Sequence, residues 1–199
     1  GVDVDNYGSG LDQLHKILTI LKSRQQQRNW CQCNTVICED LKSQSYQFLA
    51  LSPSNYAHEN QLINLQEDNE NRLPCISPNN SSVATVLRVG NDLLLFGADL
   101  ENGDSENQTG WANIIKDVWK DRGKSCFFKR AHHGSVGAMN DTVWNEMLET
   151  NVIAALTPWN RGKKLPTQDG VTKITSKTNQ SFSAAKIVIK REKANSALT

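Results

Sequence analysis

The chain has 199 residues, of which 38% are hydrophobic and 22% are charged. This size and composition predict a single globular domain over residues 1–199, with a substantial core in a layered α/β arrangement. No apolar run approaches the roughly 20 residues that cross a bilayer, and the N-terminus lacks the basic and apolar stretches of a signal peptide. A membrane span is therefore not expected, and a cytoplasmic location is the default expectation.

The formal net charge is only +1, but the charge is unevenly distributed. Residues 160–199 hold nine lysines and arginines against two acidic residues. Such a basic stretch is either a solvated surface or a contact for phosphate groups. The cysteines number five, and Cys31, Cys33 and Cys38 lack the paired spacing of a zinc knuckle. This pattern favours free thiols.

The predicted elements of the first half are a helix, a strand and a long polar loop. Apolar residues recur at helical spacing over 11–21, behind Ser9, which predicts an amphipathic helix. Residues 46–51 are typical of a buried strand that ends at Ser52 and Pro53. Residues 54–80 are polar and rich in Asn and Gln, and they predict mostly loop with one short helix.

Strands and helices alternate more regularly from residue 83 onward. Runs 83–89 and 93–96 are rich in β-forming residues and are joined by a short loop that begins with Gly90, which predicts a hairpin. The remaining predicted elements are helices over 111–119, 143–148 and 168–176, and strands over 126–129, 152–156 and 185–190.

Polar clusters follow two of these strands. Asp99 comes after the strand 93–96 and Gly97, and His132, His133 and Ser135 follow the strand 126–129. Strand ends in layered α/β folds present side chains from a rigid support. A carboxylate and at least one imidazole together suit Zn²⁺ or Mn²⁺. Alone, a strand-end Asp is commonly a helix or turn cap, and a histidine pair is more often bonded to backbone carbonyl groups than to a metal.

A basic loop follows the strand 152–156. Trp159 could stack on a nucleobase, and Arg161, Lys163 and Lys164 could hold phosphate oxygens. The alternative interpretation is a rigid surface loop, bounded by Pro158 and Pro166, with solvated charges.

Three stretches together resemble the C-terminal half of metallo-β-lactamase-fold hydrolases: NNSSVATVLRVGNDLLLFGADLE (79–101), the GW of the following helix, and CFFKRAHHGS (126–135). They look most like the hydrolase domain of bacterial DNA-uptake channel proteins, and the resemblance covers about residues 45–190. It implies an αββα sandwich with two metal ions, Zn²⁺ or alternatively Mn²⁺, at one edge of the sheets. It also implies Asp99 as a metal ligand together with one of His132 and His133, with some preference for His133.

The chain also departs from this family. The main metal motif, H-x-H-x-D-H, is absent, and the other histidines, His15 and His58, are expected to be ordinary surface residues. Ser52 stands where some relatives have a histidine, and Ala98 separates the family's Gly-Asp pair, which is expected to shift the carboxylate. The simplest interpretation is the C-terminal portion of a longer protein, a domain incomplete at its N-terminus.

The leading hypothesis is a metal-dependent hydrolase that cleaves a phosphodiester in nucleic acid or a nucleotide with a metal-activated water. Asp99, His132 and His133 would be the catalytic residues, one histidine protonating the leaving oxygen, and Ser135 and the basic loop would contact substrate. Two alternatives are a catalytically silent binding or assembly module, and a hydrolase of a lactone, thioester or lactam. We also expect a partner, either the missing N-terminal portion or a second protein, to cover the strands 83–89 and 93–97 over at least about 1,500 Å².

Overall fold

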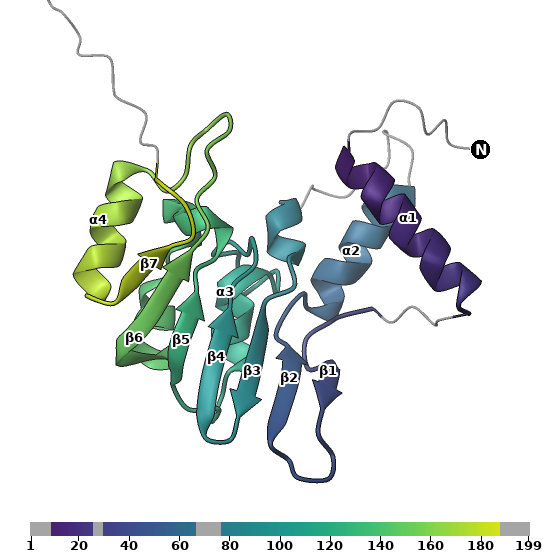
Figure 1. Ribbon diagram of the computed structural model, residues 1–199, viewed down its shortest axis with the longest axis horizontal. Coiled ribbons are helices and arrows are strands. Elements are labelled where there is room, and N and C mark those ends of the chain that lie inside the picture. Colours follow the sequence, from purple (N-terminus) through teal and green to yellow (C-terminus); the bar gives the residue numbers. More distant parts are fainter. Residues whose placement is uncertain (1–8, 26–29, 67–76, 188–199) are drawn as a thin grey trace, which may run out of the picture. The chain divides into compact units, whose positions relative to one another are not determined.

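The computed structural model describes residues 9–25, 30–66 and 77–187. The chain divides into two compact units, residues 1–30 and 31–199. The first unit contains helix α1 (Ser9–Ser23), which confirms the helix predicted from the apolar spacing (Figure 1). The sheet and every candidate site residue belong to the second unit.

The second unit is built on one seven-stranded mixed sheet in the order β1-β2-β3-β4-β5-β6-β7. Strands β1 to β4 pair antiparallel, and β4 to β7 pair parallel. The general α/β class is therefore confirmed. The strands are β1 (Val36–Glu39), β2 (Tyr46–Ala50), β3 (Thr85–Val89), β4 (Asp92–Phe96), β5 (Ser125–Lys129), β6 (Leu148–Leu156) and β7 (Ser181–Ser183).

Helical segments of several kinds connect these strands. The α-helices are α2 (Asn55–Gln66), α3 (Gly110–Asn113) and α4 (Gln168–Lys177). The 3-10 turns are η2 (Pro78–Ser81), η4 (His132–Gly134) and η5 (Val136–Ala138), and the π-helical turns are η3 (Ile114–Val118) and η6 (Val143–Met147). In the described part of the chain, none of the helices has both the length and the hydrophobicity that crossing a membrane requires.

Two elements differ from the sequence prediction. The closing strand predicted at 185–190 is wrong, because the strand is β7, three residues of which two are serines; residues 188–190 lie outside the described residues. Strand β1 was not predicted, because its four residues are all exposed and show no alternation of apolar and polar side chains. The free thiols predicted for Cys31, Cys33, Cys38 and Cys126 are present, and Cys75 lies outside the described residues.

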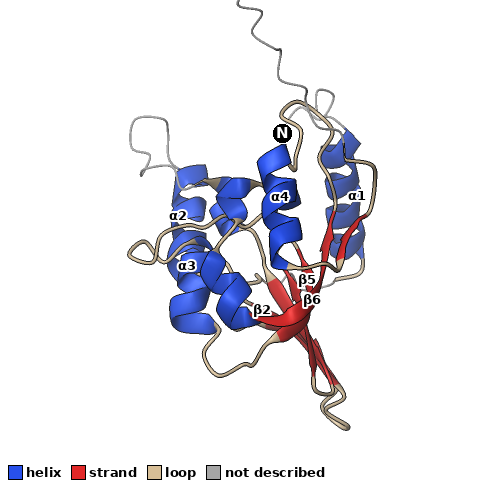
Figure 2. Ribbon diagram, turned by 90° about the vertical axis from the view of Figure 1, so that its left-hand side faces the viewer, coloured by secondary structure: helices blue, strands red, loops and turns tan. Residues whose placement is uncertain are grey.

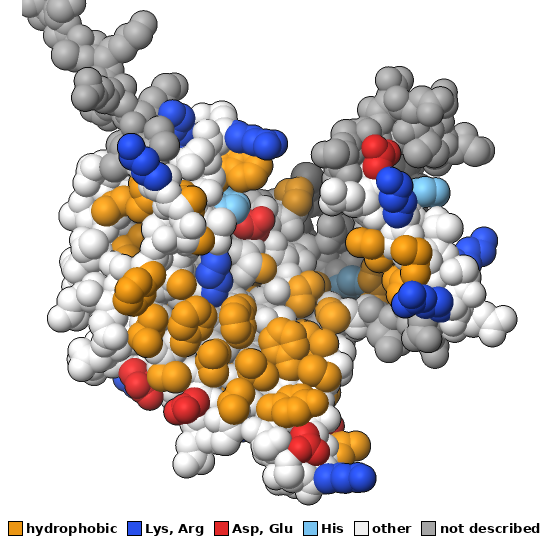
Figure 3. Space-filling view, in the orientation of Figure 1, with side chains coloured by type: hydrophobic (Ala, Val, Ile, Leu, Met, Phe, Trp, Pro, Cys, Tyr) orange, Lys and Arg blue, Asp and Glu red, His pale blue; other side chains and the backbone are white. Residues whose placement is uncertain are grey.

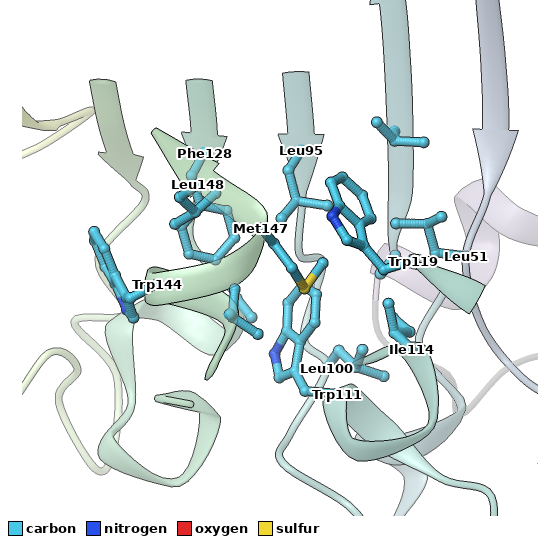
Figure 4. Close-up of a cluster of buried hydrophobic side chains, with 14 of the residues drawn as sticks. Leu51, Leu95, Leu100, Trp111, Ile114, Trp119, Phe128, Trp144, Met147 and Leu148 are labelled. Atoms are coloured by element: carbon cyan, nitrogen blue, oxygen red, sulfur yellow. The ribbon is translucent and has the colours of Figure 1, made fainter. Parts of the chain in front are cut away.

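The hydrophobic core lies on one face of the sheet. Because side chains alternate along a strand, Leu93 and Leu95 of β4 and Phe128 of β5 point to this face, where α3, η3 and η6 cover them (Figures 1 and 2). Figure 4 shows the buried side chains interleaved between strands and helices. The ring of Phe128 meets Trp111 and Trp144 edge to face, with centroids 6.0 and 5.8 Å apart, a favourable aromatic geometry.

The opposite face of the sheet, which we call the open face, is also apolar. The register places its side chains in rows across neighbouring strands, and Figure 3 shows hydrophobic side chains spread over this face. Its residues are Tyr46, Phe48, Leu87, Val89, Leu94, Phe96, Phe127 and Ile153. The second sheet of an αββα sandwich is not among the described residues, which form this one sheet.

Candidate functional site

The candidate site lies where β4, β5 and β6 end. These strands are parallel, so their carboxyl ends share one edge of the sheet. A pocket of about 560 Å³ opens there. Its lining residues are Asp99, Glu101, His132, His133, Ser135, Gly137, Trp159, Lys163 and Leu165. Six of the predicted site residues line one pocket. Arg161 and Lys164 lie on the loop between Trp159 and Leu165, two residues that line the pocket, but are not themselves among the lining residues.

Close backbone contacts hold the first two loops of the site together. The amide of Gly97 donates to the carbonyl of Lys129 at 2.9 Å, and the amide of His132 donates to the carbonyl of Ala98 at 2.9 Å. Gly97 allows this approach, because a Cβ at that position would lie only 2.7 Å from the Cβ of Ala131. The loop that carries Asp99 is thereby fixed against the loop that carries the histidines.

Three non-glycine residues of these loops have left-handed backbone conformations. The φ angles of Ala98, His132 and His133 are 46°, 43° and 53°. Residues other than glycine rarely adopt this backbone region. Such strained residues are concentrated at functional sites, where the surrounding structure keeps them in place. The turn at Ala98 accommodates the extra residue before the carboxylate, so Asp99 still lines the pocket despite the shift expected from the sequence.

His133 is oriented toward Asp99. Its Nδ1 lies 2.7 Å from the carbonyl oxygen of Thr157, and because a carbonyl only accepts, Nδ1 carries the proton. Its Nε2 lies 3.5 Å from Oδ1 of Asp99. When the ring is neutral, Nε2 and Oδ1 are both hydrogen-bond acceptors and face each other without a proton between them. A proton or a metal cation between the two atoms would stabilise this arrangement.

His132 is held differently, by a polar network. Its Nδ1 lies 3.1 Å from Oε1 of Glu101, and the side-chain amide nitrogen of Asn79 lies 3.5 Å from its Nε2. Asn79 also donates to Oε1 of Glu101 at 3.2 Å, and the hydroxyl of Ser77 donates to Oε2 at 3.2 Å. Both nitrogens of His132 thus face protein groups, whereas Nε2 of His133 faces Asp99 in the pocket.

A hairpin forms the wall of the pocket beyond His133. Trp159 and Leu165 exchange two backbone hydrogen bonds of 2.8 Å. The indole of Trp159 lies over His133 with ring centroids 5.5 Å apart and an angle of 39° between the planes. Trp159 is 44% exposed, so part of its ring remains accessible to a ligand in the pocket, which Lys163 also lines.

Other candidates from the sequence have no place in this pocket. The hydroxyl of buried Ser52 donates to the carbonyl of Ser82 at 2.6 Å and accepts from the amide of Ala84 at 2.9 Å, so it joins two backbone segments. His15 is exposed on α1 as expected. His58 differs from the expectation of a surface residue: it is half-buried, and its Nδ1 lies 2.8 Å from the amide nitrogen of Gln32.

The pocket fits a divalent metal in the kind of its donors but not in their number. Asp99 offers carboxylate oxygen and His133 offers imidazole nitrogen, both usual ligands of Zn²⁺ and Mn²⁺. Catalytic zinc sites use three protein ligands. Residues 9–25, 30–66 and 77–187 contain no group of three or more His, Cys, Asp or Glu that could hold an ion.

Sequence reasoning missed Glu101 and Asn79. Glu101 follows Asp99 by two residues after the same strand, a position that could have marked it. Asn79 is 53 residues from His132 in the sequence, and only the folded chain reveals their contact.

A scan against protein-family models finds no match for this chain, and a search of curated proteins finds none either. The geometry of the pocket therefore carries the functional argument.

Proposed function

We propose that this chain is the part of a metal-dependent hydrolase that cleaves a phosphodiester of nucleic acid or a nucleotide. The supporting observation is the Asp99–His133 pair: Nε2, the ring nitrogen that does not contact the Thr157 carbonyl, lies 3.5 Å from a carboxylate oxygen inside a pocket that Lys163 also lines. Two such donors are half of a typical zinc ligand set.

Each residue has a distinct role in this proposal. Asp99 and His133 hold the cation, and the Thr157 carbonyl keeps the His133 ring in the ligating tautomer. A metal ion, when bound, supplies a water of lowered pKa and polarises the phosphoryl oxygen. His132, beside Glu101, would be the general acid: from the ring protonated on both nitrogens, Nε2 would give its proton to the leaving oxygen in place of its contact with Asn79. Ser135 and Lys163 contact the phosphate, and Trp159 stacks on the base, with Arg161 and Lys164 adding positive charge nearby.

The remaining metal ligands come from polypeptide outside the described residues in this proposal. A complete αββα sandwich has a second sheet, and a segment that supplies it would reach the same edge as the pocket. That segment is either an N-terminal portion of a longer protein or a second chain.

We predict that this chain alone does not bind zinc tightly. Tight zinc binding needs three or four protein ligands, and the pocket offers two. In a titration against a chromophoric chelator, zinc should stay with the chelator. Mn²⁺ should nevertheless broaden the NMR signals of the His133 ring selectively, and Asp99→Asn should remove this broadening.

The exposed His15 is the matched control, since His15→Gln removes an imidazole outside the pocket. Tight, stoichiometric zinc would show that the chain contains further ligands. If Mn²⁺ leaves the His133 signals sharp, the pair is not a cation site and the metal role fails.

A phosphate-bearing substrate is tested by charge reversal of Lys163. We expect Lys163→Glu to weaken binding of a fluorescently labelled single-stranded oligonucleotide several-fold, measured by anisotropy. Because one phosphate contact is lost, the slope of log K against log salt should decrease by about 0.7.

Lys120→Glu is the matched control, because it makes the same change of charge at an exposed lysine that does not line the pocket. If the two variants weaken oligonucleotide binding equally, the effect of Lys163→Glu comes from the change in net charge and not from a contact in the pocket. The proposal of a phosphodiester would then lose its support in favour of an uncharged substrate such as a lactone.

A further inference from the structure

Polar contacts join the turn η2 to Glu101 and His132 at the candidate site. The hydroxyl of Ser77, directly before the turn, donates to Oε2 of Glu101 at 3.2 Å, and the side-chain amide of Asn79 donates to Oε1 at 3.2 Å. The same amide nitrogen lies 3.5 Å from Nε2 of His132. One short segment thus contacts both oxygens of the carboxylate and the ring nitrogen that the proposed reaction uses.

The position of Asn79 keeps a substrate away from Nε2 of His132. A general acid must come within hydrogen-bond distance, about 2.6–3.2 Å, of the oxygen that it protonates. The amide nitrogen of Asn79 occupies the Nε2 side of the ring, and Nδ1 on the other side lies 3.1 Å from Oε1 of Glu101. The leaving oxygen therefore reaches Nε2 only after Asn79 has moved.

Two buried atoms of this closed arrangement lack a hydrogen bond. Oδ1 of Asn80, which follows Asn79 in the turn, has no partner among the described residues, and Nδ1 of His132 approaches Glu101 without a hydrogen bond to it. A buried polar atom without a partner costs free energy, because water no longer hydrates it. Opening the turn would return water to both atoms, which favours the existence of a second, open state.

The turn can leave the site without exposing core residues. None of the residues of η2, Pro78–Ser81, is buried. The chain after the turn is anchored instead: the hydroxyl of Ser52 donates to the carbonyl of Ser82 at 2.6 Å and accepts from the amide of Ala84 at 2.9 Å. Segments with few buried contacts open at the lowest free energy. Residues 77–81 can consequently swing out while the anchor keeps them beside the site.

We propose that residues 77–81 form an autoinhibitory latch, which occupies Glu101 and His132 in the closed state and releases them when it opens. This inference rests on the proposed function, since it concerns the general acid of the same reaction. A fixed positioning role for Asn79 fits less well, because a positioning residue would leave Nε2 accessible to the leaving oxygen. The latch makes His132 available only in the fraction of molecules in which it is open.

The latch is tested by the reactivity of His132 toward diethyl pyrocarbonate, which modifies accessible imidazole nitrogens, in the full chain at a fixed pH. Mass spectrometry of the modified peptides compares His132 with the exposed His15 as an internal reference. Because Asn79→Ala removes contacts that close the latch, we expect it to raise the rate at His132 about fivefold. Asn91→Ala makes the same change in an exposed turn and should leave the rate unchanged.

Asn80→Ala should have the opposite effect. It removes the buried oxygen that has no partner in the closed state, so it favours closure and should lower the rate at His132 about fivefold. Opposite effects at two neighbouring asparagines distinguish a latch from a general loss of structure, which would raise the rate in both variants. Circular dichroism checks that both variants fold.

Three outcomes would overturn the latch: a rate at His132 that Asn79→Ala leaves unchanged or lowers, an equal increase in Asn91→Ala, and an increase in Asn80→Ala. The Mn²⁺ experiment on His133 separates this inference from the proposed function. If Asn79→Ala raises the reactivity of His132 while Mn²⁺ leaves the His133 signals sharp, the latch stands and the metal role fails. If Mn²⁺ broadens those signals while the reactivity of His132 does not change, only the latch fails.

Discussion

Replacing Gly97 with alanine is expected to lower the free energy of unfolding by about 3 kcal/mol and to separate Asp99 from His133. The new Cβ would lie 2.7 to 2.9 Å from the side chain and backbone of Ala131, closer than atoms pack. Backbone cannot rotate away as a flexible side chain can, so the two loops must move apart. Overpacking of this kind costs about 1–3 kcal/mol. We expect the upper end of this range for Gly97→Ala, because two of the three atoms that the new Cβ would meet are backbone atoms of Ala131.

Urea unfolding measures the stability of this variant, and Mn²⁺ broadening of the His133 ring signals measures the geometry of the pair. Gly137→Ala is the matched control, because a Cβ there meets only the Ser135 hydroxyl oxygen at 3.7 Å. If Gly97→Ala is as stable as this control and keeps the broadening, the close approach of the loops does not maintain the site.

Replacing Arg130 with methionine is expected to stabilise the protein by about 2 kcal/mol. Arg130 is 1% exposed, and its Nε and Nη1 have no hydrogen-bond partner among the described residues. The Trp144 ring, 5.5 Å from the guanidinium carbon, compensates only part of the lost hydration. Exchanging an uncompensated buried charge for an apolar side chain of similar volume removes this cost.

Burial lowers the pKa of Arg130 from its usual value to about 10. The folded state therefore disfavours the charged form, and the penalty is complete below about pH 10. As the pH rises above about 10, the folded state loses this proton before the unfolded state does, so the wild-type protein regains stability. The difference between Arg130→Met and wild type should consequently be constant between about pH 6 and 9.

Thermal or urea unfolding of both proteins checks this expectation. Arg122→Met is the contrasting variant, because Arg122 donates to the Val118 carbonyl at 2.8 Å and to Asn34 at 3.1 Å. That substitution should destabilise. If Arg130→Met destabilises as well, the guanidinium has a partner that offsets its burial.

Much of the secondary structure of the second unit was predictable, because the sequence patterns that indicate it span only a few neighbouring residues. The hairpin of β3 and β4 follows from two β-rich runs around Gly90, and the strand ends carrying Asp99 and the two histidines follow from where the apolar runs stop. Parallel strands end at one edge, so the meeting of these side chains was foreseeable. The placement of β7 was not, because a short polar edge strand has no pattern that distinguishes it from a loop.

The sequence by itself determined which side chains lie at this edge of the sheet, because the residues that directly follow a strand lie where the strand ends. Only the tertiary structure decided how those groups are used. The Thr157 carbonyl accepts the proton of His133 Nδ1, and Asn79 and Glu101 contact the ring nitrogens of His132. Three residues of these loops have left-handed backbone conformations. The sequence likewise does not distinguish the two faces of β4 and β5, because both carry apolar residues. In the structure, helices cover Leu95 and Phe128, whereas Phe96 and Phe127 lie on the open face. Both differences arise from contacts between residues distant in the chain, which no local pattern encodes.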